Sequence, residues 1–372
     1  RQQFHRCVSR HRGDYKVRHF TCRAQFICLV FAQLTHRESL RDIEACLNAV
    51  PSRWPQLGLP GAVARTTLAE ANEARDWRIY ADLAQHLIRR ARKLYASESL
   101  DEDIDQTVYA LDSTTIDLCL ALFPWARYRR ADAAIKLHTL LDVRGPIPTF
   151  VHITDGKCAD VHALDELVLE PGSFYVMDRG YLDLARLYLF VVVGAFFVTR
   201  AKRGMRFSRI QSRPVDRTTG LRCDQIVWMA TAEGARKYPE KLRRVAFRDP
   251  ETGKVLVFLT NNFDLPALTI ARLYKLRWRV ELFFKWIKGH LRIKSFLGTS
   301  RNAVLTQVWS ALCTYLMVAI LKKQLELPQS LHTILQILST HAFSQVPLYE
   351  LLREIGPPEN ASDSDNQLTF NW

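Results

Sequence analysis

The most informative segment of the chain reads Tyr274-Lys-Leu-Arg-Trp-Arg-Val-Glu-Leu-Phe-Phe-Lys-Trp-Ile-Lys288, and its periodicity is typical of one amphipathic helix. At about 100° per residue, with Tyr274 set at zero, Arg277 falls near ~300°, Glu281 near ~340° and Lys288 near ~320°. These four side chains therefore share one narrow stripe. The adjacent face is apolar and is expected to be buried; it consists of Leu276, Val280, Phe283 and Ile287.

An ordinary solvated face would explain part of this stripe. Arg277 and Glu281 are spaced i, i+4, which stabilises a helix by only about 0.2–0.5 kcal/mol. That explanation leaves Tyr274 and Lys288 unaccounted for. It also leaves unexplained two separate strand-like runs that each end in an aspartate.

These two runs lie far from the stripe in sequence. Asp112 follows Val108-Tyr-Ala-Leu, and Asp178 follows Phe174-Tyr-Val-Met. A single aspartate at a strand end is more often a turn or cap residue than a ligand. In open α/β sheets, however, functional groups gather at the carboxyl ends of the strands. Together with Glu281 from a packed helix, the two aspartates predict a catalytic site of three carboxylates.

A site of carboxylate oxygens alone favours particular cofactors. Mg²⁺ and Mn²⁺ prefer carboxylates and water as ligands. Without a cation, three neighbouring carboxylates would raise one another's pKa by mutual repulsion. Two such ions can activate an attacking hydroxyl and stabilise a leaving oxygen in a phosphodiester displacement. We therefore predict that Asp112, Asp178 and Glu281 bind two divalent metal ions, Mg²⁺ or Mn²⁺.

The middle of the chain has the strand and helix order of an α/β fold built on a mixed sheet. The expected strands are 107–112, 136–143, 148–154, 174–178 and 195–200, and the expected helices are 161–169 and 182–192. Residues 201–262 break this order with short β-like runs at 225–231, 243–248 and 255–260 among many basic residues. After Pro266 the chain is expected to be helical.

The N-terminal part has helical periodicity from 21 to 94. Ser39 is expected to cap one helix, and Thr67 with Glu70 forms a capping-box pattern for the start of another. Two short helices on a basic chain resemble a helix-turn-helix DNA reader, and an ordinary helical bundle is the alternative. Residues 1–20 are densely basic; they are interpreted as an arm that contacts phosphates, and a solvated tail is the alternative.

Composition limits the classes of partner. The 372 residues contain 52 Lys and Arg against 38 Asp and Glu, a formal charge of +14. That excess favours a polyanionic partner, nucleic acid before an anionic membrane surface, although a merely basic enzyme remains an alternative. No apolar run reaches the length of a membrane span, so no transmembrane helix is expected. The 8 cysteines are scattered without metal-ligand spacing, which favours a reduced, cytoplasmic protein without zinc.

The stripe resembles a known signature. Tyr274, Arg277, Glu281 and Lys288 match the Y-(2)-R-(3)-E-(6)-K pattern of the insertion-sequence-four family of bacterial DDE transposases. The segment Leu111-Asp-Ser-Thr114 resembles the one that carries this family's first catalytic Asp. Met177-Asp-Arg-Gly-Tyr181 resembles the one that carries the second. The resemblance covers roughly residues 20–350, and the order of all its parts agrees.

The resemblance implies a domain organisation. A ribonuclease-H-like catalytic domain, with a mixed sheet flanked by helices, would comprise residues 105–200 and 263–325. A β-rich insertion would occupy 201–262. A helical DNA-binding region would occupy 1–100, and a helical tail would occupy 326–372.

The resemblance also implies roles for single residues. Glu281 would be a metal ligand, while Tyr274, Arg277 and Lys288 would contact DNA phosphates near the cut. Trp278 and Lys285 flank the stripe, near ~40° and ~20°, and are further candidates for DNA contact.

Two more residues are candidates outside the stripe. Arg179, beside the second aspartate, is a DNA-contact candidate. Trp228 is the only Trp of the insertion and could hold a flipped base, as a Trp of the insertion does in some family members. A core aromatic in a small β domain is the favoured alternative for Trp228.

The expected function is cut-and-paste transposition: cleavage at inverted-repeat ends and strand transfer into target DNA, by a homodimer. A metal-dependent nuclease that cuts without joining is one alternative. A catalytically silent DNA-binding protein is another, against which the intact Asp112, Asp178 and Glu281 argue. DNA is the expected partner, the cytoplasm the expected location, and no membrane contact is expected.

Overall fold

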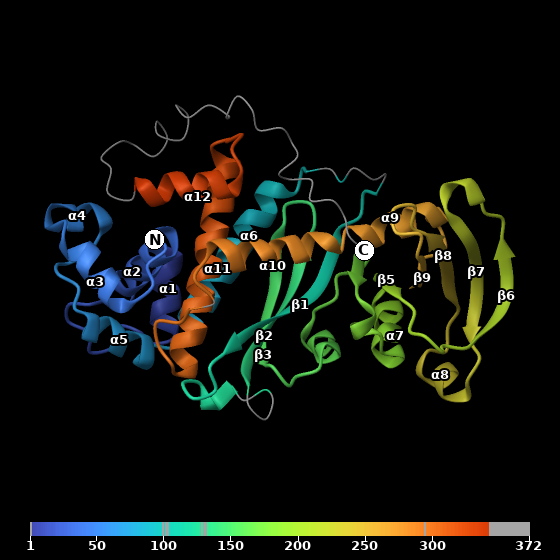
Figure 1. The fold of residues 1–372 in the computed structure, drawn as a ribbon, viewed down its shortest axis with the longest axis horizontal. Coiled ribbons are helices and arrows are strands. Elements are labelled where there is room, and N and C mark those ends of the chain that lie inside the picture. Colours follow the sequence, from blue (N-terminus) through green and yellow to red (C-terminus); the bar gives the residue numbers. More distant parts are fainter. Residues whose placement is uncertain are drawn as a thin grey trace. The chain divides into compact units, whose positions relative to one another are not determined.

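The computed structural model describes residues 2–98, 100, 104–126, 128, 132–293 and 295–341. They divide into two compact units (Figure 1). The first unit comprises the described residues of 1–96, 116–135 and 284–341, and the second those of 97–115 and 136–283. The chain therefore passes repeatedly between the units.

The second unit is built on a nine-stranded sheet with the order β3-β2-β1-β4-β5-β9-β8-β7-β6. Strand β1 runs parallel to β4 and β4 parallel to β5, whereas β5–β9 and the following pairs are antiparallel. The predicted mixed sheet flanked by helices is confirmed, and the order β3-β2-β1-β4-β5 is ribonuclease-H-like. The strands are β1 (Val108–Leu118), β2 (Ala133–Asp142), β3 (Ile147–Asp155), β4 (Phe174–Met177), β5 (Phe196–Arg200), β6 (Phe207–Arg213), β7 (Leu221–Met229), β8 (Leu242–Arg248) and β9 (Val255–Thr260).

One face of this sheet is covered by α7 (Leu184–Val193) and α8 (Ala232–Lys237) (Figure 1). Leu111 of β1 and Met177 of β4 point toward this side, where they join a buried cluster with residues of α7. Successive side chains of a strand point to opposite faces. The residues that follow, Asp112 and Asp178, are therefore directed to the other face.

The other face is covered by α9 (Ala267–Lys275), which contacts β4, β5, β7 and β8. Tyr274 packs on Phe258 of β9 with the ring centroids 4.8 Å apart, an aromatic contact typically worth about 0.5–1.5 kcal/mol beyond its buried area. Phe258 precedes Leu259, which belongs to the cluster on the α7 side. Helix α9 thus lies on the face toward which Asp112 and Asp178 point.

The prediction of one continuous helix from Tyr274 to Lys288 is wrong. Helix α9 ends at Lys275, and α10 (Trp278–His290) begins three residues later. Between them the amide of Arg277 donates to the carbonyl of Tyr274 at 3.2 Å, and that of Val280 to the carbonyl of Arg277 at 3.1 Å. Bonds of this i→i−3 type give about three residues per turn. Positions computed at about 100° per residue therefore do not hold across this turn.

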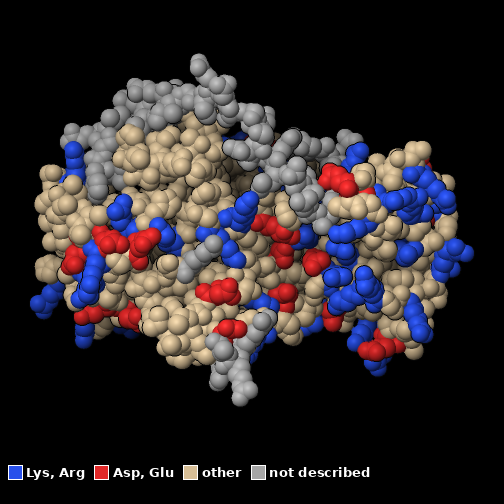
Figure 2. Space-filling view, in the orientation of Figure 1, with Lys and Arg blue, Asp and Glu red and all other residues tan. Residues whose placement is uncertain are grey.

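The insertion is more extended than the sequence predicts. Strand β6 and helix α8 had no predicted counterpart, and β7 begins at Leu221. Inside it, Arg243 makes a two-pronged ion pair with Asp224, with both N–O distances 2.8 Å and both side chains at most 5% exposed. Figure 2 shows Lys and Arg side chains gathered on the part of the surface where Figure 1 shows β6 to β8.

The first unit is helical, as predicted for the N-terminal region. Its central helix, α11 (Arg301–Gln324), packs against helices of the N-terminal region and against α12. By length and composition α11 could cross a membrane, but 89% of its most apolar window is buried inside the structure. The other helices of the unit are α1 (Gln2–Arg10), α2 (Cys22–Leu34), α3 (Leu40–Asn48), α4 (Trp54–Leu57), α5 (Arg65–Ala74), α6 (Arg78–Tyr95) and α12 (Leu331–Thr340).

Five short 3₁₀ helices complete the described elements. One of them replaces the predicted helix 161–169. They are η1 (Pro51–Arg53), η2 (Pro124–Ala126), η3 (Asp160–Glu166), η4 (Arg179–Tyr181) and η5 (Arg217–Thr219).

The two predicted helix caps have different outcomes. Ser39 and Asp42 form a reciprocal capping box at the start of α3, as expected. The predicted start at Thr67 is wrong, because α5 begins at Arg65 without a side-chain cap of its own. Glu44 of α3 instead accepts the backbone N–H of Arg65 at 2.9 Å. A side chain from a neighbouring helix therefore satisfies a free amide of the first turn.

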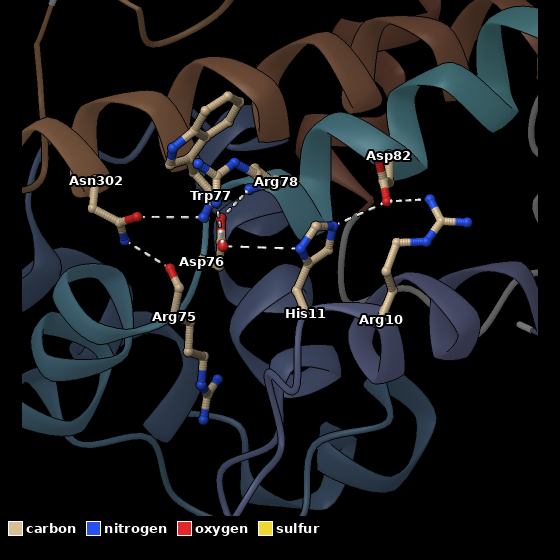
Figure 3. Close-up of polar contacts among 8 residues, drawn as sticks. All are labelled: Arg10, His11, Arg75, Asp76, Trp77, Arg78, Asp82 and Asn302. Carbon is tan, nitrogen blue, oxygen red and sulfur yellow. Dashed lines mark hydrogen bonds and ion pairs between the residues drawn. The ribbon is translucent and has the colours of Figure 1, made fainter.

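The basic N-terminal segment begins with a helix. Residues 2–10 form α1, with Cys7 and Val8 buried. Figure 3 shows Arg10 and His11 directed at Asp82 of α6, with N–O distances of 2.7 Å and 3.0 Å to the same oxygen. Two of the basic residues that were assigned to phosphates, Arg10 and His11, are thus engaged by a carboxylate of the same unit, and phosphate contact by the segment stays a prediction.

Candidate active site

The two candidate aspartates lie side by side. Strands β1 and β4 are parallel neighbours with Leu111 opposite Met177, so Asp112 and Asp178 follow at the same level of the sheet. Strand β1 does not end at Asp112, as the sequence predicted, but continues to Leu118. Asp112 lies where β1 extends past the end of β4. On the β4 side of β1, Asp112 therefore has no paired strand residue beside it.

Arg277 joins Asp112 to Glu281. Its Nη1 lies 2.7 Å from Asp112 Oδ2, and its Nη2 lies 2.5 Å from Glu281 Oε1. The guanidinium Nε is buried and has no hydrogen-bond partner among the described residues. The hydroxyl of Tyr274 donates to Asp178 Oδ1 at 3.4 Å. The structure thus brings together Asp112, Asp178 and Glu281 through two residues of the predicted stripe.

The electrostatics show the same convergence. Burial raises the pKa of Asp112 from 3.8 to about 6; Arg277 opposes this rise, and the charges of Glu281 and Asp178 add to it. Burial also raises the pKa of Tyr274 to about 12, so its phenol stays neutral and able to donate. Burial lowers the pKa of Arg277, but its electrostatic interactions with Tyr274, Asp112 and Glu281 outweigh the effect of burial and raise the pKa overall.

An Asp112→Asn variant should be more stable than the wild type when metal is chelated. A carboxyl whose pKa is raised by folding does not lower the free energy of unfolding at a pH below its pKa in the unfolded chain. As the pH rises from about 4 to about 6, the folded protein loses stability, and the full loss above that range is on the order of 1–3 kcal/mol. Asparagine removes it, so the gain should appear above pH 6 and vanish below pH 4. Urea unfolding in EDTA at both ends of this range measures it.

Asp165→Asn is the matched control for that measurement. The hydrogen bond from Arg186 is the main cause of the lowered pKa of Asp165. Its asparagine variant should therefore lose stability at neutral pH. A loss of stability in Asp112→Asn at pH 7.5 would contradict the account of the buried carboxylate.

The three carboxylates are of the chemical type that binds divalent metal ions. As they stand, no three Asp, Glu, His or Cys side chains of the described residues surround a point that could hold a metal ion. Asp112 and Glu281 nevertheless share one cationic group, the guanidinium of Arg277. All their ligand atoms are carboxylate oxygens, the donors that Mg²⁺ and Mn²⁺ prefer. A cation is thus already part of the charge balance of the site.

The candidate DNA-contact residues on α10 differ in their surroundings. Lys285 is exposed, and Lys288 lines a cavity of about 140 Å³ together with His36 and Arg292; these residues belong to the first unit. Trp278, the first residue of α10, has its indole N–H buried without a hydrogen-bond partner among the described residues. A buried indole N–H does not favour the predicted DNA contact of Trp278.

The remaining two candidates are on the surface. Arg179 is exposed in η4, directly after Asp178. Trp228 is 36% exposed, and its neighbours Val227 and Met229 belong to the buried cluster on the α7 side. Alternation along β7 places Trp228 on the opposite face, the one that α9 covers. The favoured alternative of a core aromatic therefore does not hold.

Sequence reasoning missed a polar group formed by Ser113, Lys136 and Asp160. Ser113 donates to Asp160 at 2.8 Å, Lys136 lies 3.0 Å from the same oxygen, and Asp160 approaches the turn after Asp178. The sequence contained no usable signal for Asp160. An Asp just before an expected helix at 161–169 is typical of a helix start.

The chain matches two family models. The model described as Transposase DDE domain matches residues 103–317, and a domain of unknown function matches residues 1–60. A protein of Sinorhizobium fredii that carries the name transposase y4zB is 32% identical over 68% of this chain and 70% of its own length.

Two further relatives carry the names of transposases of insertion sequence elements. The transposase of IS5377 from Geobacillus stearothermophilus is 31% identical over 56% of this chain and 55% of its own length. The transposase of IS4SA from Synechocystis is 22% identical over 83% of this chain and 87% of its own length. A solved piggyBac transposase synaptic complex with hairpin DNA aligns with a TM-score of 0.47 and 11% identity, over 92% of this chain and 77% of that one.

The family model spans more than half of the chain and includes Asp112, Asp178 and Glu281. An enzyme role in transposition and a general dependence on divalent metal follow from this domain. The chain belongs to the DDE transposases.

Proposed function

We propose that this DDE transposase acts by cut-and-paste: it cleaves DNA at the inverted-repeat ends of a transposon and joins them to target DNA. The observation that carries the proposal is the convergence of Asp112 and Asp178, on adjacent parallel strands, with Glu281 through Arg277. Within the insertion-sequence families, the Y-(2)-R-(3)-E-(6)-K signature favours the insertion-sequence-four group.

Each residue of the site has a separate task. Two Mg²⁺ or Mn²⁺ ions bound by Asp112, Asp178 and Glu281 would supply the activation of an attacking hydroxyl and the stabilisation of a leaving oxygen. The neutral phenol of Tyr274 holds Asp178 in one orientation. Arg277 has a rigid fork of donors that suits a DNA phosphate as well as it suits a carboxylate.

DNA binding would extend over several surfaces. Arg179, Lys285 and Lys288 supply charge to phosphates, and the exposed Trp228 offers a flat ring for a base. The helical region 1–100 would bind the transposon end, with 105–200 and 263–325 as catalytic domain, 201–262 as insertion and 326–372 as tail. The tail lies largely outside the described residues. A homodimer in the cytoplasm, bound to two ends, is the proposed assembly.

Strand transfer is the property that separates this proposal from a nuclease. Wild-type protein, a plasmid carrying the DNA that flanks the gene, and Mg²⁺ should give both excised ends and ends joined to target DNA. Joining is expected because the 3′-hydroxyl released by cleavage can serve as the next nucleophile in the same site. Sequencing of the junctions measures it.

The alternatives give different products. Nicked ends that never become joined would show a nuclease. Binding without any cleavage, at every Mg²⁺ and Mn²⁺ concentration, would show a silent DNA-binding protein. A plasmid whose flanking repeats are scrambled is the matched control and should give neither cleavage nor joining.

A further inference from the structure

A cavity of about 140 Å³ lies at the C-terminal end of α10, within the first unit. Lys288 comes from α10, Arg292 from the loop that follows, and His36 from the turn between α2 and α3. The described residues that line the cavity include these three basic ones and no acidic one: His36, Lys288, Gly289, Leu291, Arg292 and Ser295. A cavity lined by one sign of charge attracts ions of the opposite sign, so this one fits an anion.

Two buried glutamines hold the loop that carries Arg292. The backbone N–H of Arg292 donates to Gln33 Oε1 of α2 at 2.7 Å, and its carbonyl accepts from Gln307 Nε2 of α11 at 2.6 Å. Gln307 Nε2 also donates to the carbonyl of Ser295 at 2.8 Å. Gln33 and Gln307 are at most 1% exposed. The backbone of this loop is therefore fixed before a ligand arrives, which lowers the entropic cost of binding.

Arg292 also fixes His36. Its Nη2 donates to the carbonyl of His36 at 2.9 Å, and His36 has a φ of 56°, an uncommon conformation for a residue with a side chain. Glu38 lies 3.2 Å from the same nitrogen, but its side chain is 73% exposed, so this ion pair is weak. The guanidinium Nε is buried and has no hydrogen-bond partner among the described residues. A structural role therefore explains Nη2 and leaves another donor of Arg292 unused.

Two further histidines interact with His36. The rings of His290 in α10 and His332 in α12 lie 4.1 Å apart, and Nδ1 of His332 is buried without a hydrogen-bond partner among the described residues. Burial lowers the pKa of His36, and Arg292, His332 and Arg37 lower it further. Burial also lowers the pKa of His290, and His332 and His36 add to that effect. His36 and His290 are therefore uncharged at neutral pH as long as no anion is bound.

Packing alone does not explain this group of side chains. Lys288 and Arg292 carry positive charge, and charges of like sign in one cavity disfavour one another. An anion in the cavity would compensate both charges. It would also favour the protonated form of the nearby His36 imidazole.

We propose that this cavity binds a phosphate group of the DNA backbone, with Lys288 and Arg292 as charged ligands, and that His36 takes up a proton from solvent as the phosphate enters. DNA is the expected source of the phosphate because the same helix, α10, carries Glu281. The inference rests on the proposed function, which already gives Lys288 a phosphate. It adds Arg292 and His36 as ligands and a dependence of DNA binding on pH.

The first test is the pH dependence of binding between the full protein and a labelled duplex taken from the DNA that flanks the gene. Affinity should rise as the pH falls from about 8 to about 6, by at most about tenfold per pH unit for one proton. His36→Asn should flatten this dependence, because asparagine tolerates the left-handed backbone but cannot take up a proton. His162→Asn, at a histidine that is 58% exposed in η3, is the matched control and should keep the wild-type dependence.

Proton uptake by the wild type can be measured without any variant. Calorimetric titration of the duplex in two buffers of different ionisation enthalpy gives the number of protons bound. We expect uptake at neutral pH in the wild type and less uptake in His36→Asn. Binding without proton uptake would overturn the inference, and so would a folded His36→Asn protein with the uptake of the wild type.

Arg292→Gln tests the second ligand. Glutamine keeps a donor for the carbonyl of His36 and removes the charge. The slope of log K against log salt should fall by about one. An unchanged slope in a folded Arg292→Gln protein would contradict phosphate binding by Arg292.

Inorganic phosphate in the same calorimeter distinguishes the two sources of a phosphate group. If inorganic phosphate binds with proton uptake and the duplex binds without it, the cavity belongs to a small anion and the inference fails. Cleavage of the flanking DNA separates the inference from the function on which it rests. If the wild type cuts and joins ends without proton uptake on binding, only the inference fails; if it neither binds nor cuts them, the proposed function fails as well.

Discussion

A Glu281→Gln variant should lose metal-dependent cleavage of transposon ends, with the rate falling by at least about 10³-fold. The amide keeps the size of the side chain but cannot supply a negative ligand. It also leaves Arg277 with one anionic partner in place of two, since Nη2 now lies 2.5 Å from Glu281 Oε1. The charge balance of the site, and not only one bond, is therefore changed.

The measurement is single-turnover cleavage of a labelled end over a range of Mg²⁺ and Mn²⁺. Glu251→Gln, an exposed glutamate in the turn before β9, is the matched control and should keep the wild-type rate. Retained cleavage in a folded Glu281→Gln protein would contradict the three-carboxylate site. End binding should survive the substitution, which distinguishes a chemical defect from loss of fold.

An Arg277→Ala variant should move metal binding and DNA binding in opposite directions. Without DNA, the guanidinium contacts Asp112 Oδ2 and Glu281 Oε1, two oxygens that a metal ion would also use. Its removal should tighten Mn²⁺ binding by at least about tenfold, because a competing cation is gone. Binding of transposon ends should weaken, and the slope of log K against log salt should fall by about one.

Titration calorimetry without DNA and end binding at several salt concentrations measure the two effects. Arg186→Ala is the matched control, because Arg186 also makes a two-pronged ion pair, with Asp165 at 2.7 Å, away from the site. It should leave metal affinity unchanged. Equal metal affinity in Arg277→Ala and wild type would show that the arginine does not compete for these oxygens.

The position of the aspartates could be predicted from sequence for a local reason. Phe174-Tyr-Val-Met is an uninterrupted apolar run, typical of a strand buried on both faces, and the charged Asp178 marks its end. Asp112 follows a similar run, which made the same prediction possible. The parallel pairing of the two strands, which sets their side chains together, depends on contacts distant in sequence.

The turn between α9 and α10 could not be predicted in that way. No Gly or Pro interrupts Lys275-Leu-Arg-Trp278, so the local pattern favours a continuous helix. Tyr274 packs against Phe258, and Arg277 binds Asp112. Both partners are remote in sequence. Sequence reasoning accordingly assigned Arg277 to a DNA phosphate, noted only its i, i+4 spacing to Glu281, and missed its ion pair with Asp112.

Strand β6 was missed because it is an edge strand. Its sequence, Phe207-Ser-Arg-Ile-Gln-Ser-Arg213, is mostly exposed and polar. Edge strands commonly carry charged residues that prevent pairing with other chains. A search for apolar runs or clean alternation therefore does not detect it.

The path of the chain through the insertion sets the order in which the site can form during synthesis. Strands β1 and β4 leave the ribosome first, and Arg277 and Glu281 follow only after β6 to β9. At about 5–20 residues per second, the wait lasts roughly 5–20 s. Until then, Asp112 and Asp178 have neither the arginine nor the glutamate of their site. Any nascent or prematurely terminated chain that ends within the insertion is thus unable to cut DNA through these three carboxylates.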